Sequence, residues 1–145
     1  MYSACTAWLI SPSSAAFTAL AAAIDSAGGQ AHPMSTSECL QWRERVRAGL
    51  YQGPLPNLLF LDADFAYGHP DGHLEALLCE PPWMFLPLVV VAGVEHPEAR
   101  RRAYSEGAAA WITLPPAGAL RETRLAHIAQ YWVKTAVLPE ITLPL

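Results

Sequence analysis

Asp62 is the residue whose type and position best suit chemistry, because it directly follows an apolar run at 58–61. Such a run predicts a buried strand of a parallel sheet. Open α/β sheets bind their ligands at the carboxyl ends of such strands, where Asp62 would lie. A carboxylate in this place can accept a chemical group, help to hold a cation, or cap the following turn through its own backbone. We favour a structural or vestigial role unless suitable companions surround it.

The segment after Asp62 holds four further side chains of metal-ligand type, which are Asp64, His69, Asp71 and His73. Their spacing matches no established metal motif. Pro70 and Gly72 stand among them and are typical of turns. We therefore predict no metal here and expect Asp64 to be a solvated loop residue.

Ser13 and Ser14 are the candidates for a hydroxyl nucleophile. No histidine lies near them in sequence, and no glycine elbow frames them. The segment 11–14 also lacks the glycines of a phosphate-binding loop. Capping of a helix that runs to about residue 27 explains both serines more simply, although serines at a helix start could still hold an anion.

Apolar strand candidates alternate with helix candidates along the whole chain. The expected strands are 7–11, 30–32, 57–61, 88–92 and 109–113, and the expected helices are 14–27, 37–50, 73–79, 97–106 and 116–133. Five such units predict a flavodoxin-like (βα)5 domain, in which a doubly wound, five-stranded parallel sheet lies between two layers of helices. The domain would span 1–133, with 134–145 as a tail or the start of a linker.

The composition excludes several classes of protein. Hydrophobic residues make up 52% of the 145 residues and charged residues only 15%, which indicates a globular chain rather than a disordered one. A net charge of −4 gives no electrostatic case for direct binding of nucleic acid. Residues 1–24 lack the basic start of a secretory signal, and the apolar run at 83–94 is too short to span a bilayer. We therefore expect a cytoplasmic protein without a membrane segment.

Three segments, taken in order, resemble the receiver domain of bacterial response regulators, over about residues 7–133. The segment 58–62, with Asp71 and Gly72 after it, resembles the phosphoacceptor strand and its loop. The segment 87–93 resembles the fourth strand. The segment 99–115 resembles a helix, a glycine-alanine turn, an aromatic strand and a final Lys-Pro pair, here Leu114 and Pro115.

The resemblance implies a site from which most working parts are missing. A working receiver has an acid pair that holds Mg²⁺, a phosphoacceptor aspartate, a hydroxyl residue and a lysine. Asp62 matches the phosphoacceptor. The acid pair falls on Ser13 and Ser14, the hydroxyl residue on Ala92 and the lysine on Leu114.

The missing charges form one physical pattern. Acids without the metal or lysine would repel one another, and a lysine without the acids would be a buried, unpaired cation. Both signs are absent here, so the pocket is close to neutral, and we expect Ser13, Ser14 and Thr113 to hydrogen-bond Asp62. We predict a pseudo-receiver that has no catalytic residues, is not an enzyme and needs no cofactor.

The resemblance also implies an interaction surface on the fourth helix, fifth strand and fifth helix of the domain. Its expected residues are Arg101, Tyr104, Trp111, Arg121 and Arg124. Arginine and aromatic side chains are enriched at the centres of protein interfaces. The expected partner is another protein or a second copy of the chain.

The leading hypothesis is therefore a signalling module that acts by protein–protein interaction without phosphorylation. One alternative is a genuine phosphoacceptor, in which Asp62 works with an atypical Mg²⁺ site that uses Asp64 or Asp71. Another is a small-ligand-binding domain on the same flavodoxin-like sheet.

Overall fold

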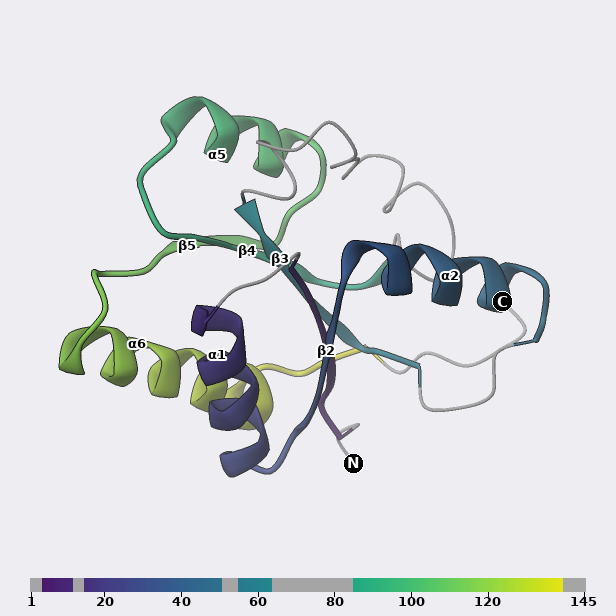
Figure 1. Ribbon diagram of the computed structural model, residues 1–145, viewed down its shortest axis with the longest axis horizontal. Coiled ribbons are helices and arrows are strands. Elements are labelled where there is room, and N and C mark those ends of the chain that lie inside the picture. Colours follow the sequence, from purple (N-terminus) through teal and green to yellow (C-terminus); the bar gives the residue numbers. More distant parts are fainter. Residues whose placement is uncertain (1–3, 12–14, 51–54, 64–84, 140–145) are drawn as a thin grey trace.

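The protein forms one sheet covered by helices on both faces (Figure 1). The structure, a computed structural model, describes residues 4–11, 15–50, 55–63 and 85–139. The predicted helix at 73–79 lies outside these residues. The strands are β1 (Thr6–Ile10), β2 (Gln30–Met34), β3 (Leu58–Asp62), β4 (Leu88–Ala92) and β5 (Ala110–Thr113). The helices are α1 (Ala15–Ser26), α2 (Thr36–Arg47), α5 (Pro97–Ser105) and α6 (Ala119–Gln130), and α6 continues into a π-helical turn, η2 (Tyr131–Thr135).

The strands lie in the order β2-β1-β3-β4-β5, and every neighbouring pair is parallel. This arrangement confirms the predicted doubly wound, five-stranded sheet. Because all strands point the same way, Asp62 of β3 and the carboxyl ends of β1, β4 and β5 meet at one end of the sheet. None of the helices in the described part of the chain is long and apolar enough to cross a membrane.

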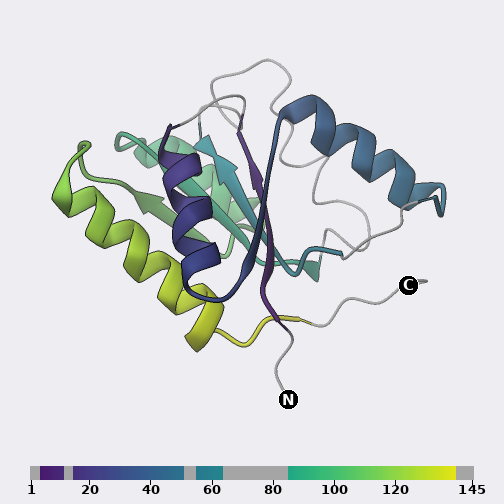
Figure 2. The same cartoon turned by 60° about the horizontal axis from the view of Figure 1, so that its bottom comes forward.

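Strand alternation divides the core into two layers. Leu59, Leu61 and Val90 belong to the cluster that includes buried residues of α2 and α5. Leu58 and Phe60 belong to the cluster that includes buried residues of α1 and α6. Figure 2 shows α1 and α6 together on one side of the sheet, with α2 on the other. The faces are called the α2/α5 face and the α1/α6 face below.

The outer strand β2 is longer than predicted and ends against a defined helix cap. The predicted strand ended at residue 32, but Pro33 and Met34 continue it. Proline is tolerated there because β2 lies at the edge of the sheet and needs no inward donor at this position. Ser35 caps α2, and its side chain forms a capping box with Glu38.

The chain after α6 packs against the end of the sheet opposite to Asp62, where the strands begin. A Cβ on Gly29, at the start of β2, would lie 3.1 Å from Cγ2 of Val133 in η2. Leu138 is only 7% exposed and joins the core of the α1/α6 face. Figure 2 accordingly shows the yellow segment that follows α6 beside the amino-terminal end of β1. Packed structure therefore extends past residue 133, into the segment expected to be a tail.

Candidate functional site

Asp62 lies at the carboxyl end of β3 and is hydrogen-bonded to a serine of the neighbouring strand. Ile10 of β1 pairs with Leu61, so the next residue of β1, Ser11, lies alongside Asp62. Alternation places both side chains on the α1/α6 face. The Ser11 hydroxyl donates to Oδ2 of Asp62 at 3.1 Å. A neutral hydroxyl thus contacts the carboxylate at this end of β1.

Ser11 was not among the predicted site residues. The companions of Asp62 were predicted to be Ser13 and Ser14, and these residues, like Asp64, lie outside the described part of the chain. The signal that identifies Ser11 is the register between β1 and β3. A shift of one or two residues in that register cannot be resolved from apolar runs alone.

Ala92 and Leu114 are both buried at the ends of their strands, but they lie on different faces of the sheet. Ala92 belongs to the core of the α2/α5 face and Leu114 to that of the α1/α6 face. The Leu114 backbone N–H donates to the Ala92 carbonyl at 2.8 Å, which fixes the relative position of the two strand ends. Both side chains are apolar, so neither can hold a phosphoryl oxygen as a hydroxyl or an ammonium group would.

Thr113 does not make the contact that we predicted for it. The expectation was a hydrogen bond to Asp62, but Thr113 shares the α2/α5 face with Trp111, two residues before it, whereas Asp62 lies on the other face. The Thr113 hydroxyl accepts a hydrogen bond from the indole Nε1–H of Trp111 at 3.2 Å. The prediction was wrong because it considered which residues end the strands and not the direction in which each side chain points.

The described donors around Asp62 do not fit a magnesium site. Mg²⁺ is usually bound through carboxylates in near-octahedral oxygen geometry. Asp62 contributes one carboxylate, and Ser11 adds a neutral hydroxyl oxygen. Within the described ranges, no three His, Cys, Asp or Glu side chains are grouped so that they could hold a metal ion. The one lysine of the chain, Lys134, belongs to η2, at the end of the sheet where the strands begin and away from Asp62.

The predicted interaction residues do lie on neighbouring elements, namely α5, β5 and α6. Tyr104 is 48% exposed, and its hydroxyl accepts a hydrogen bond from the backbone N–H of Trp111 at 3.0 Å. Trp111 is half-buried and packs against the core of the α2/α5 face. Nε of Arg121 donates to the carbonyl of Pro115 at 2.7 Å, which fastens α6 to the loop before it.

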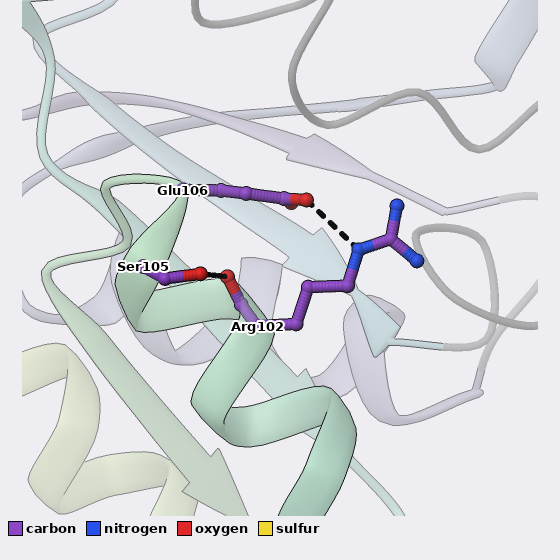
Figure 3. Close-up of polar contacts among 3 residues, drawn as sticks. All are labelled: Arg102, Ser105 and Glu106. Carbon is purple, nitrogen blue, oxygen red and sulfur yellow. Dashed lines mark hydrogen bonds and ion pairs between the residues drawn. The ribbon is translucent and has the colours of Figure 1, made fainter.

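The arginines of this region differ in whether they are already paired. Nε of Arg102 donates to Oε1 of Glu106 at 2.8 Å, and the Ser105 hydroxyl donates to the Arg102 carbonyl, as Figure 3 shows. Arg101 and Arg124 are exposed, and neither forms an ion pair with another residue in the described part of the chain. Their charges therefore face solvent.

Comparison with solved structures places this fold among response regulators. The phosphorylated cyanobacterial phytochrome response regulator RcpA has a TM-score of 0.75 and 16% identity, over 95% of this chain and 100% of that one. The Mn²⁺-bound form of the response regulator Rcp1 has a TM-score of 0.74 and 16% identity, over 93% and 99%. An atypical orphan response regulator, described as having a phosphorylation-independent regulatory mechanism, has a TM-score of 0.56 and 11% identity, over 92% and 99%.

The chain therefore has the fold of a response-regulator receiver domain, as the resemblance implied. No model of a protein family matches the sequence, and no curated protein does so either. At these identities the likeness defines the fold, and the role must be argued from the site itself.

Proposed function

We propose that this chain is a receiver-like signalling module of the cytoplasm that acts through protein–protein contacts and not through phosphoryl transfer. The observation that carries the proposal is the chemistry at the end of the sheet that bears Asp62. A serine hydroxyl contacts the carboxylate, and the ends of β4 and β5 present Ala92 and Leu114. Catalysis of phosphoryl transfer depends almost entirely on positioning the reactants and on neutralising their charge.

The first experiment is incubation with Mg²⁺ and a small-molecule phosphodonor, followed by intact mass spectrometry. We expect no phosphoryl adduct, because the ends of β4 and β5 present the apolar side chains of Ala92 and Leu114 where a hydroxyl and an ammonium group would be needed. Asp62→Asn is the control for nonspecific modification, and a receiver with a complete site is the positive control. A stoichiometric adduct on the wild-type chain that Asp62→Asn abolishes would overturn the proposal in favour of the phosphoacceptor alternative.

The contact surface that we propose is formed by α5, β5 and α6. It presents a half-buried indole, a half-exposed phenol and two exposed arginines, a combination that suits the centre and rim of an interface. Glu98 and Glu122 are also exposed on α5 and α6, so the surface carries both signs of charge. A surface of mixed sign can complement a second copy of itself about a two-fold axis. A second copy of this chain is therefore the partner tested first.

Single charge reversals test the surface. Arg101→Glu and Arg124→Glu are expected to weaken self-association by roughly tenfold, since each sets a negative charge against an acidic partner group. Arg45→Glu on α2 is the matched control, because Arg45 is also exposed and the change in charge is identical. The measurement is light scattering coupled to gel filtration over a wide concentration range. Equal effects of the three variants would show that the surface is not the contact, and a wild-type chain that stays monomeric throughout would direct the search to another protein.

A further inference from the structure

Trp111 is held by hydrogen bonds at two of its own N–H groups. The backbone N–H donates to the Tyr104 hydroxyl at 3.0 Å, and the indole Nε1–H donates to the Thr113 hydroxyl at 3.2 Å. The first bond connects the end of α5 to β5, and the second lies within β5. The backbone and the ring of one residue are thus fixed by two different neighbours.

The bond to Tyr104 is made at the open edge of the sheet. β5 is the last strand in the sheet, and the Leu114 N–H points inward to Ala92 of β4. Backbone groups alternate in direction along a strand, so those of Trp111 point away from β4. The Tyr104 hydroxyl therefore covers an outward donor of the edge strand and sets the distance between α5 and β5.

The bond to Thr113 fixes the ring. Residues two apart in a strand project from the same face, which brings the Thr113 hydroxyl beside the indole. Threonine is β-branched and restricted at χ1, so its hydroxyl is a well-placed acceptor. Ala92 is the residue of β4 that pairs with Thr113, and its methyl group offers the ring no competing acceptor.

We propose that Thr113 and Tyr104 are positioning residues that hold Trp111 in one orientation, whether or not the Asp62 carboxylate is modified. The surface formed by α5, β5 and α6 then presents a fixed aromatic group to a partner. That consequence for binding rests on the proposed function, whereas the fixed orientation of the ring does not. The two can therefore be tested separately.

The test is nuclear magnetic resonance of the ¹⁵N-labelled indoles, with the Trp111 signal assigned from Trp111→Phe. Thr113→Val removes the acceptor while it preserves the shape of the side chain, and Thr113→Ser retains a hydroxyl. We expect hydrogen exchange of the Trp111 indole N–H to accelerate by about fivefold to tenfold in Thr113→Val, in keeping with the net strength of one hydrogen bond. Thr113→Ser should stay near the wild-type rate, and the indole signals of Trp8 and Trp132 should not change.

An unchanged exchange rate for the Trp111 indole in Thr113→Val would overturn the proposal. So would an Asp62→Asn variant in which the Trp111 indole signal is displaced as far as in Thr113→Val, because the ring would then respond to the carboxylate. Tyr104→Phe tests the second anchor through exchange of the Trp111 backbone amide, which should also accelerate. A phosphoryl adduct on Asp62 would refute the proposed function and leave these results standing, so the two failures are distinguishable.

Discussion

Replacing Trp8 with alanine is expected to lower the free energy of unfolding by about 3–5 kcal/mol, the usual loss for a large aromatic side chain in a core. Trp8 is 0% exposed and lies in β1, which pairs with both β2 and β3. Its ring meets Trp42 of α2 edge to face, with 5.0 Å between the ring centroids. The cavity would open beneath the only aromatic pair that joins α2 to the sheet within the described residues.

Urea titration followed by circular dichroism measures this effect. Trp132→Ala is the matched control, because Trp132 also makes an edge-to-face pair, with Tyr131 at 5.1 Å, but is half-buried in η2, just after α6. It should cost less than half as much as Trp8→Ala, since less apolar surface returns to water. Equal losses at the two positions would contradict the assignment of Trp8 to the core.

Raising the pH above about 9 is expected to destabilise the fold through two buried thiols. Burial raises the pKa of Cys39 from 9.0 to about 12, against a smaller lowering by the charge of Arg43. Burial also raises the pKa of Cys5 from 9.0 to about 11. The folded state therefore holds these protons more tightly than the unfolded state, so their stabilising effect is complete below pH 9 and is lost as the pH rises toward the folded pKa values.

Each thiol should cost roughly 2 kcal/mol between about pH 8 and about pH 10.5, at about 1.4 kcal/mol for each unit of pKa difference. The measurement is the unfolding free energy in urea across that range, under reducing conditions. Cys39→Ala and Cys5→Ala should each reduce the loss of unfolding free energy over this pH range by the contribution of one thiol. This holds whatever either substitution does to stability at pH 7. A decline of the same steepness in both variants would assign it to other groups.

Much of the fold follows from local patterns in the sequence. Apolar runs of strand length, punctuated by Gly28-Gly29, Gly53-Pro54 and Gly107, were sufficient to predict five parallel strands in one sheet. Two kinds of detail were not accessible. The β2–α2 boundary depends on the reciprocal Ser35–Glu38 cap, which competes with Pro33 as a turn signal. Packing of Leu138 is a long-range contact that no periodicity reports.

The candidate site was predicted less completely than the fold. Asp62, Ala92 and Leu114 were identified correctly as residues at strand ends, because position after an apolar run is a local property. Ser11 was missed and Thr113 was assigned to the wrong neighbour. Both depend on the register and facing of adjacent strands, where a slip of one residue moves a side chain to the other side of the sheet.

The two outer strands of the sheet have consequences for how copies of this chain can assemble. On β2, the Ala31 N–H is taken by the Asp25 carboxylate at 3.1 Å, and Pro33 has no N–H to offer. On β5, the hydroxyl of Tyr104 accepts a hydrogen bond from the backbone N–H of Trp111. Exposed strand margins are templates for polymerisation through the main chain, and proteins suppress it with proline, charge and covering groups. Assembly by adding a sixth strand is thus discouraged at both margins, which leaves side-chain surfaces as the route to specific complexes and protects the chain from open-ended fibres.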